Sequence, residues 1–587
     1  MHCFRVWAPL ARRVSVSLNG TACAMQGPDA RDWWRLEVSD AGPGTAYGFL
    51  VDDDANIYPD PCSLRQPNGV HELSHVYDRG AFAWSDAGFQ PPPLAGGIVY
   101  ELHIGTFTAE GTFDAAADKL EYLAELGVTH VELMPVAAFE GRHGWGYDGV
   151  ALFAVHEPYG GPDGLKRFVD SAHRKGLAVL LDVVYNHFGP SGNYTGKFGP
   201  YTIDAHHTPW GGAVNLEDAG SDQVRRFFCD NAAMWLRDFH IDGLRLDAVH
   251  AFVDRSAIHF LEQLSAKVET LAAALGRPLV LIAESDLNDP RVVTPHEAAG
   301  YGFDAQWSDD FHHALFAVLN PRERSGYYVD FGSLAQLAKA LKQTFVYDGI
   351  YSNYRKRIHG RPAGNLTQHR FLGYIQTHDQ VGNRAQGDRI AQIAGVERAK
   401  MAAAVVLLGP FVPMLFQGEE WACSSPFQYF ADHHDPELAR LVSEGRRREF
   451  SAFGWDPESI PDPESEATFA ASKLRWEELA DGEHAEMLMW YRELIRLRRA
   501  TPSLNDGTSG ATRVAFDETE KWFTIERGAI LIICNLGEQK RSFPITASGR
   551  VVLASRNPVE SKPETIVLPP VSIAVLATTN CARVSQE

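Results

Sequence analysis

The sequence predicts an α/β protein, with a (β/α)8 TIM barrel flanked by an N-terminal β-sandwich and a C-terminal all-β domain. Three observations predict it. Residues 1–93 alternate apolar and polar side chains between frequent glycine, proline and aspartate residues, which is typical of short antiparallel strands. From residue 98, short β-rich runs alternate with amphipathic helices, as in a closed parallel sheet. After the helix that ends near Arg499, the two-residue alternation returns.

The first domain, residues 1–93, is expected to be an immunoglobulin-like β-sandwich. The alternation is clearest in residues 4–7, 14–18 and 34–38. The run Pro-Pro-Pro-Leu-Ala-Gly-Gly at residues 91–97 follows, and its prolines and glycines are typical of a linker. A domain boundary is therefore predicted there.

The second domain, residues 94–505, is expected to form the barrel. Helices are predicted at about 114–126, 163–175 and 222–240, and the last of them places its large apolar side chains on one broad stripe. The eight strands are predicted at residues 98–104, 130–134, 178–184, 242–246, 279–283, 303–306, 372–376 and 412–416. Eight β/α repeats of this kind place the functional groups on the loops after the strands.

The third domain, residues 506–587, is expected to be small and all-β. Its strands are predicted at residues 522–525, 529–533, 551–553, 565–568 and 572–576.

Charge and cysteine content narrow the class of function. The 587 residues carry a formal net charge of −21 with a pI of about 5.5, which argues against a nucleic-acid or anionic-membrane partner and favours a neutral substrate. The seven cysteines are scattered and never spaced as CxxC, so neither a disulfide framework nor a zinc site is indicated. Because no signal-like start and no membrane-length apolar run is present, a cytoplasmic protein is expected.

Three carboxylates follow predicted barrel strands. Asp247 ends Gly-Leu-Arg-Leu-Asp, Glu284 ends Val-Leu-Ile-Ala-Glu, and Asp379 lies in Gln-Thr-His-Asp-Gln. Cleavage of a glycosidic bond with retention needs a nucleophilic carboxylate and a carboxylic acid about 5–5.5 Å apart. Adjacent strands of a parallel sheet lie about 4.8 Å apart, so carboxylates at neighbouring strand ends reach that separation. The pattern predicts a sugar-cleaving site at the rim of the barrel.

The local sequence suggests a role for each of the three. Arg245 is expected to hold Asp247 ionised as the nucleophile, because the two side chains lie on one strand face. Glu284 ends an apolar run, which is expected to raise its pKa and suit it to proton donation; the alternative is an ordinary strand-end salt bridge. Asp379, beside His378, is expected to bind sugar hydroxyls.

Two further side chains, His187 and Tyr147, are predicted to bind sugar only because they occur together with the three carboxylates. Taken singly, His187 is more often a satisfied structural group and Tyr147 is more often core filler. On loops after neighbouring strands, together with the three carboxylates, they are interpreted as a hydrogen-bond donor and a stacking face of one sugar subsite.

These segments closely resemble the four signature regions of the α-amylase superfamily of glycoside hydrolases. The resemblance covers the whole chain, because many members carry an N-terminal sandwich, of carbohydrate-binding-like type, and a C-terminal β domain around the barrel. The segments that carry it are Asp-Val-Val-Tyr-Asn-His at 182–187, Gly-Leu-Arg-Leu-Asp at 243–247, the strand that ends at Glu284, and His-Asp at 378–379.

Within that superfamily, other segments look like the maltooligosyltrehalose trehalohydrolases. Gln417, where methionine is expected, is a small departure that leaves the catalytic assignment untouched. The segments are residues 307–314 (Trp-Ser-Asp-Asp-Phe-His-His-Ala), 378–384 (His-Asp-Gln-Val-Gly-Asn-Arg), 416–421 (Phe-Gln-Gly-Glu-Glu-Trp), 425–434 (Ser-Pro-Phe-Gln-Tyr-Phe-Ala-Asp-His-His), 445–450 (Gly-Arg-Arg-Arg-Glu-Phe) and 453–455 (Phe-Gly-Trp).

The resemblance implies hydrolysis of the α-1,4 bond next to a terminal trehalose unit, in a pathway shared with a maltooligosyltrehalose synthase. Asp247, Glu284 and Asp379 would be catalytic, and maltooligosyltrehalose and related α-1,4-glucans would be the substrates. The implied substrate-binding residues are Tyr147, Asp148, His187, Arg245, His250, Asp309, Asp310, Phe311, His312, His313, His378, Gln380 and Asn383. No cofactor motif is present, and the short loop after the third strand argues against a structural calcium.

Two alternatives stay open. A glycogen branching enzyme uses the same three carboxylates and a similar N-terminal sandwich but transfers the glycosyl group to another glucan chain; the residues Gln-Val-Gly-Asn after Asp379 favour the trehalohydrolase. A catalytically silent glucan-binding protein could also use this fold, because fold alone does not determine function.

Overall fold

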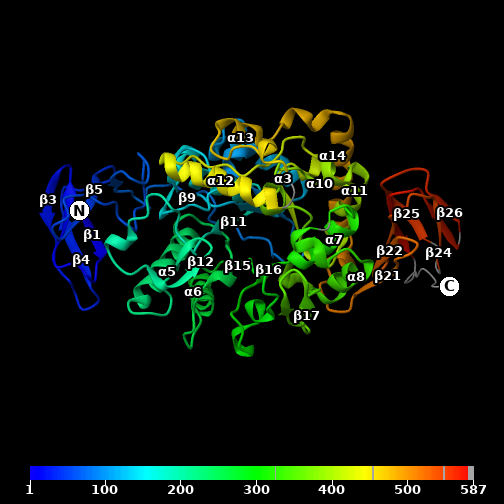
Figure 1. Cartoon of the computed structure of the whole chain (residues 1–587), viewed down its shortest axis with the longest axis horizontal. Helices are drawn as coiled ribbons and strands as arrows, with labels where there is room; N and C mark the ends of the chain where they lie inside the picture. Colours follow the sequence, from blue (N-terminus) through cyan, green and yellow to red (C-terminus); the bar gives the residue numbers. More distant parts are fainter. Residues whose placement is uncertain (324, 453–454, 546–548, 563, 579–587) are drawn as a thin grey trace.

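The computed structural model describes residues 1–323, 325–452, 455–545, 549–562 and 564–578. Its elements lie along one long axis, with the N-terminal strands at one end, the barrel in the middle and the C-terminal strands at the other end (Figure 1). Among the helices of these residues, none combines the length and the apolar character that crossing a membrane requires.

Eight parallel strands close into a barrel in the middle of the chain, as predicted. Each strand pairs with the next one along the sequence, and the last, β20, pairs with the first, β7. The barrel strands are β7 (Val99–Leu102), β8 (His130–Leu133), β11 (Ala178–Val183), β14 (Gly243–Leu246), β15 (Val280–Ala283), β16 (Ala305–Trp307), β19 (Phe371–Gly373) and β20 (Val412–Phe416). All eight overlap the strands expected from the sequence.

The helices between the strands depart from a regular repeat in two places. The helix predicted at 114–126 is two pieces, α2 (Phe113–Ala117) and α3 (Leu120–Leu126). Between β15 and β16 the chain forms only the 3-10 turns Pro290–Val293 and His296–Ala298, because prolines and glycines interrupt this segment. The other long helices are α4 (Gly161–Arg174), α5 (Ser221–Asp238), α6 (Phe260–Leu275), α7 (Asp309–Leu319), α8 (Leu334–Gln343), α11 (Val396–Leu408), α12 (Pro436–Ala452) and α14 (Gly482–Ala500).

Short elements fill the connections on the barrel. They are the helices α1 (Ile104–Phe107), α9 (His378–Gly382), α10 (Ile390–Ala394) and α13 (Glu466–Ala471), and the paired strands β9 (Ala137–Ala138) with β10 (Ala151–Val155), β12 (Thr202–Thr208) with β13 (Gly211–Val214), and β17 (Asp348–Ser352) with β18 (Arg357–Gly360). Of these, α9 carries Asp379, and the β12–β13 hairpin lies in the connection between β11 and α5.

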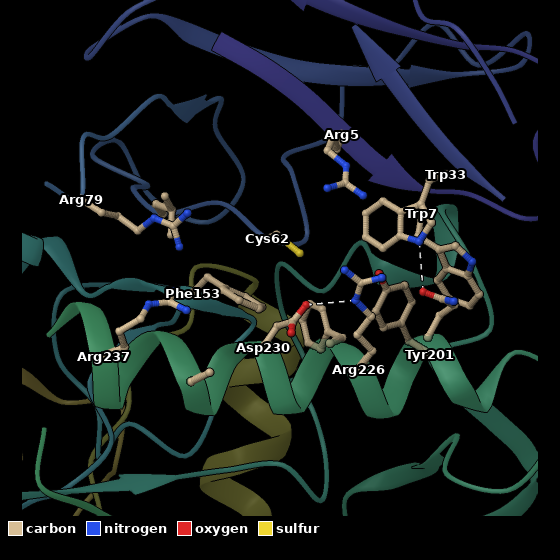
Figure 2. A pocket seen from close by; sticks show the side chains of 14 residues that line it. Arg5, Trp7, Trp33, Cys62, Arg79, Phe153, Tyr201, Arg226, Asp230 and Arg237 are labelled. Carbon is tan, nitrogen blue, oxygen red and sulfur yellow. Dashed lines mark hydrogen bonds and ion pairs between the residues drawn. The ribbon is translucent and has the colours of Figure 1, made fainter. Parts of the chain in front are cut away.

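The N-terminal strands form two antiparallel sheets that pack against the barrel. Strands β1 (His2–Trp7) and β4 (Trp33–Val38) pair with each other, and β3 (Thr21–Ala24), β2 (Val14–Leu18), β5 (Ala46–Val51) and β6 (Ser74–His75) form the second sheet. Phe4, Val16 and Phe49 are buried in a core continuous with that of the barrel. Where β1 and β4 face α5, a pocket is left between them (Figure 2).

The C-terminal strands also form two sheets. Strands β21 (Thr512–Asp517), β22 (Trp522–Arg527), β23 (Ile530–Asn535), β28 (Ser572–Thr578) and β25 (Gly549–Ala554) make the larger sheet, and β24 (Arg541–Pro544), β27 (Thr565–Leu568) and β26 (Glu560–Lys562) make the smaller one. We propose the domain boundaries near residues 93 and 505, because the strands of the flanking sheets end or begin on either side of these positions.

Candidate active site

The register between β14 and β15 brings the first two predicted carboxylates together. Leu246 pairs with Ala283, so Asp247 and Glu284 are the next residue on each of two adjacent parallel strands. The backbone N–H of Glu284 donates to the carbonyl of Leu246 at 3.0 Å, which holds the two strand ends side by side. The side chains of Asp247 and Glu284 remain 12% and 19% exposed, so both are open to a ligand at the rim.

Arg245 connects three carboxylates at the centre of the site. Its Nη1 donates to Asp182 at 2.6 Å and to Asp247 at 3.1 Å, and its Nη2 donates to Glu284 at 2.8 Å. The guanidinium is fully buried and stacks over the ring of Trp307 at 4.1 Å. One positive charge therefore faces three acidic groups, which favours retention of a proton among them.

The pKa directions of the two central carboxylates are the reverse of the sequence-based expectation. Burial, together with the charge of Glu284, raises the pKa of Asp247 well above its usual range. Burial also opposes ionisation of Glu284, but the Arg245 guanidinium and the Ala248 N–H, which donates to its Oε2 at 2.9 Å, bring its pKa below the usual value. The sequence did not reveal that Arg245 reaches Glu284 on the next strand.

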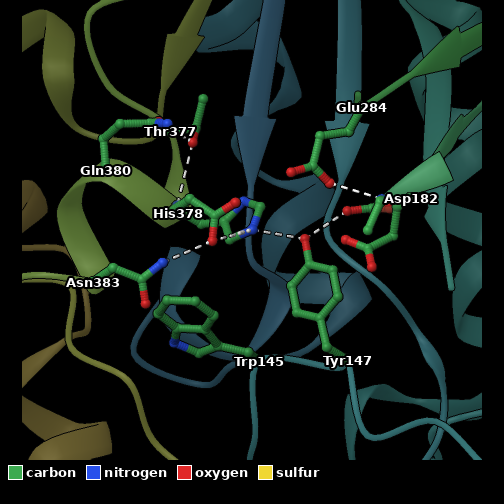
Figure 3. Close-up of polar contacts among 12 residues, drawn as sticks. Trp145, Tyr147, Asp182, Glu284, Thr377, His378, Gln380 and Asn383 are labelled. Carbon is green, nitrogen blue, oxygen red and sulfur yellow. Dashed lines mark hydrogen bonds and ion pairs between the residues drawn. The ribbon is translucent and has the colours of Figure 1, made fainter. Parts of the chain in front are cut away.

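A hydrogen-bonded row leads from His378 to Arg245. Figure 3 shows Tyr147 between His378 and Asp182; its hydroxyl lies 2.8 Å from His378 Nε2 and donates to Asp182 at 2.6 Å. Glu101 lies 2.5 Å from the other ring nitrogen of His378. Burial opposes the charged form of His378, but Asp379 and Glu101 raise its pKa to about 9. His378 is therefore cationic at neutral pH and donates to Tyr147.

Asp379, the third predicted carboxylate, lies in the first turn of α9, and its side chain is 32% exposed. Asn383 Nδ2 donates to its Oδ1 at 3.1 Å, and Arg446 of α12 donates to Asn383 Oδ1 at 3.2 Å and to the Gly382 carbonyl at 2.5 Å. A cavity of about 190 Å³ lies beside this turn, and its lining includes Gln380, Asn383, Tyr327, Glu449 and Trp455.

Three other predicted residues lie around the carboxylates. His187 Nε2 donates to the Tyr147 carbonyl at 3.1 Å, and burial lowers the pKa of His187 to about 4, so it is neutral. Asp148 turns toward His433, at 3.8 Å, and burial raises its pKa. His250 follows Asp247 in a 3-10 turn, and its Nε2 lies 4.0 Å from Asp286, two residues beyond Glu284.

The predicted run from Asp309 to His313 is only partly at the site. Asp309, in the first turn of α7, accepts from Tyr374 at 2.5 Å, and burial raises its pKa to about 7. Asp310 instead accepts from the backbone N–H groups of Val346 and Tyr347 at 2.6 and 2.8 Å. Successive helical residues are about 100° apart, so one helix turn cannot present all five side chains to one site.

Two of the remaining members of this run, Phe311 and His312, are packing residues. Phe311 is fully buried, with its ring 4.8 Å from that of Phe411. His312 is buried 2.8 Å from the Tyr328 hydroxyl, and burial lowers its pKa to about 3. His313 is surrounded by aromatic rings, and burial lowers its pKa well below the usual value. We correct the expectation that Asp310, Phe311 and His312 line a subsite; for His313, which lies beside Tyr327 of the cavity lining, it stays a prediction.

The structure adds residues that the sequence reasoning missed. Asn186 Nδ2 donates to Asp247 at 3.2 Å, and Trp210 of the β12–β13 connection stacks on His187 at 5.1 Å and is 46% exposed. Glu101 could have been found from its position near the end of the first barrel strand. Arg446 lies 63 residues from Asn383, and no local pattern indicates their contact.

Residues of the other segments that resemble the trehalohydrolases contact the first barrel strand or lie beside the site. Gln417 accepts from the His103 N–H at 3.0 Å, and Phe427 stacks on Trp145 at 5.4 Å beside the site. Phe453 and Gly454 lie outside the described residues. Within the part of the chain that the structure describes, no group of three or more His, Cys, Asp or Glu side chains is arranged to hold a metal ion.

Comparison with known proteins gives a consistent result. The family model for the alpha amylase catalytic domain matches residues 57–199, and a domain of unknown function (DUF3459) matches residues 507–575. A malto-oligosyltrehalose trehalohydrolase from Rhizobium sp. (strain M-11) is 49% identical over 582 residues, covering 98% of this chain and 97% of the relative. One from Saccharolobus solfataricus is 43% identical over 559 residues, covering 95% of each.

A solved structure agrees with these relatives. A crystal structure from Salmonella typhimurium, described as an alpha amylase, has a TM-score of 0.90 and 38% identity, and covers 98% of this chain and 97% of that one. Identity and coverage of this extent, together with three carboxylates that follow β14, β15 and β19 on one barrel rim, place the chain in one family. The protein belongs to the malto-oligosyltrehalose trehalohydrolase family of α-amylase-type glycoside hydrolases.

Proposed function

We propose that the protein hydrolyses the α-1,4-glucosidic bond next to the terminal trehalose of maltooligosyltrehalose, with retention of configuration, and releases trehalose. The contact of one guanidinium, that of Arg245, with both Asp247 and Glu284 carries this proposal. This shared contact keeps the two carboxyl groups close together. A separation of about 5–5.5 Å favours direct attack of a carboxylate on the sugar, whereas activation of an intervening water needs a wider gap.

In the proposed reaction, Asp247 attacks the anomeric carbon while Glu284 protonates the leaving oxygen of trehalose. Glu284 then takes a proton from water, which attacks the glycosyl-enzyme and restores free Asp247. Asp379 binds hydroxyls of the reacting ring, and its contacts strengthen as that ring flattens toward the transition state.

The proton must lie on Glu284 when substrate reacts, whereas the contacts with Arg245 and the Ala248 N–H favour its ionised form. A glycosidic oxygen accepts hydrogen bonds and cannot donate them, so it favours protonated Glu284 as a donor. The electron-poor anomeric carbon favours ionised Asp247. Since both carboxylates touch Arg245, moving the proton leaves the total charge unchanged. We therefore infer that bound substrate favours protonated Glu284 and ionised Asp247.

The cavity beside α9 is the proposed place for the trehalose unit. The α,α-1,1 linkage turns the last glucose away from the direction of a linear α-1,4 chain, so its hydroxyls need partners of their own. Gln380, Asn383 and Glu449 offer polar groups there, and Tyr327 and Trp455 offer ring faces. These partners would stay unpaired with a linear glucan end, which lowers its affinity.

The alternative functions have weaker support. A 1,4-alpha-glucan branching enzyme from Corynebacterium jeikeium is 27% identical over 459 residues, covering 71% of this chain and 60% of that enzyme. A silent glucan-binding role does not explain three carboxylates on one rim. A maltooligosyltrehalose synthase is the proposed source of the substrate, and the cytoplasm is the proposed location.

Product analysis tests the proposal. Purified protein is incubated with maltotriosyltrehalose and, separately, with amylose, and the products are identified by chromatography and NMR. We expect trehalose and maltotriose from the first substrate, with the anomeric configuration of the first-formed maltotriose retained. Accumulation of α-1,6 branches in amylose would replace this proposal with the branching reaction, and an inverted product would exclude Asp247 as a covalent nucleophile.

A further inference from the structure

A pocket of about 400 Å³ lies outside the active site, where the N-terminal sheet meets α5. Four arginines line it. Figure 2 shows Arg5 extending from the N-terminal sheet, Arg226 and Arg237 rising from α5 on the opposite side, and Arg79 entering from one end. Three separate segments of the chain therefore direct guanidinium groups into one space.

The arginines are only partly neutralised. Asp230 pairs with Arg226 at 3.3 Å, and Asp238 pairs with both Arg79 at 2.9 Å and Arg237 at 2.6 Å. Two carboxylates thus face four guanidinium groups, which leaves a net charge of +2. Within the described residues, Arg5 has no ion-pair partner. This local charge is opposite to the formal charge of −21 on the whole chain.

Aromatic rings form the rest of the pocket wall. Trp33 is half-buried, and its Nε1 donates to Gln223 of α5 at 3.0 Å, which holds the indole across the junction. The guanidinium groups of Arg5 and Arg226 lie over the Trp33 ring at 5.1 and 5.7 Å. Phe153 adds a second ring, labelled in Figure 2 near Arg237. Planar rings beside cations suit a ligand with an anionic group and an apolar ring face.

We propose that this pocket binds a phosphorylated monosaccharide, with the phosphate among the arginines and the sugar ring against Trp33 or Phe153. Arginine is the side chain whose forked donors match phosphate oxygens. The volume lies at the lower end of the range of about 300–1,000 Å³ typical of small-molecule sites, which suits one sugar ring better than an oligosaccharide. Binding here would also link the N-terminal sheet to α5, whose end leads into the strand that carries Arg245.

The test is calorimetric titration of the full chain with glucose 6-phosphate, with glucose and inorganic phosphate as separate titrants. The variants are Arg5→Met and Arg226→Met, and Arg31→Met is the matched control, because Arg31 is an exposed arginine of the same domain outside the pocket. All three positions are exposed, so the fold should be preserved in each variant, and thermal unfolding checks this. Hydrolytic activity of Arg5→Met should equal that of wild type, which separates this inference from the proposed function.

We expect saturable binding of glucose 6-phosphate that weakens with added salt and that falls about tenfold in Arg5→Met and in Arg226→Met, but not in Arg31→Met. Bound ligand should also raise the unfolding temperature of wild type. The inference is overturned if glucose 6-phosphate does not bind wild type at millimolar concentration, or if both pocket variants bind it as wild type does. Equal binding of inorganic phosphate and glucose 6-phosphate would overturn the assignment of a sugar-bearing ligand.

Discussion

Replacement of Arg446 by methionine tests whether α12 positions the third carboxylate. Arg446 is the link from α12 to α9: it holds Asn383 and the Gly382 carbonyl, and Asn383 in turn donates to Asp379. Its guanidinium also lies over the rings of Tyr429 and Phe450 at 5.0 and 4.5 Å. Methionine keeps the contact with these rings and removes these two hydrogen bonds, together with the one that Arg446 donates to Glu449 at 3.1 Å.

The expected fall in kcat of Arg446→Met follows from the hydrogen bonds that are lost. Hydrogen bonds that involve a charged group contribute about 1.5–3 kcal/mol each, and here they act on Asp379 through Asn383. If the transition state loses stabilisation equal to one such bond, the activation free energy rises by that amount. Because about 1.4 kcal/mol corresponds to a factor of ten in rate, kcat falls roughly 10- to 100-fold. KM should change less, because Asp379 strengthens its contacts as the reacting ring distorts.

The assay compares kcat and KM for maltotriosyltrehalose in Arg446→Met, Arg446→Lys and Arg440→Met. Arg440 is a control on the same helix; it is exposed and pairs with Glu437 and Glu444, both at 2.6 Å. Arg446→Lys retains one charged donor and should recover part of kcat, which a purely structural role would not produce. An Arg446→Met enzyme with the kinetic constants of Arg440→Met would refute the positioning role.

Four other outcomes are expected. Asp247→Asn and Glu284→Gln should each lower kcat by several orders of magnitude in a protein that still folds, and wild-type turnover in either would contradict the assignment of the site. The pH profile of kcat/KM should be bell-shaped: activity is lost at low pH when the nucleophile is protonated, and at high pH when the shared proton leaves the pair. A flat profile from about pH 4 to pH 9 would contradict this. Asp310→Ala should reduce the free energy of unfolding by about 2–3 kcal/mol in urea titration while leaving substrate preference unchanged, because it removes bonds to two backbone N–H groups; an altered preference with normal stability would return Asp310 to the site. Treatment with EDTA should leave activity unchanged, and a loss restored by calcium would reveal a metal site.

Much of the fold could be predicted because the sequence patterns that indicate it lie within short segments of the chain. The change from two-residue alternation to alternating strands and helices locates the barrel, and Asp247 and Glu284 follow its strands directly. The absence of a helix between β15 and β16 was not predicted, although Pro290, Pro295 and Gly300 interrupt that segment.

The contacts that tune the site could not be predicted in this way. The register that lets Arg245 reach Glu284 depends on pairing between strands 39 residues apart along the chain, and it reverses the pKa directions of the pair. Glu101 meets His378 across 277 residues. The orientations of Phe311 and His312 depend on which face of α7 packs against the barrel, and sequence spacing alone does not specify that face.

The ratio of kcat/KM for maltotriosyltrehalose to that for maltopentaose, which has the same number of glucose units, tests the central claim most directly. Polar groups of this cavity become covered when the sugar binds, and each one that is covered without a partner costs about 1–3 kcal/mol. Two or three left without partners by a linear chain end predict a preference on the order of 10²–10⁴ for maltotriosyltrehalose. Equal kcat/KM on the two substrates would contradict the claim that this site recognises a terminal trehalose.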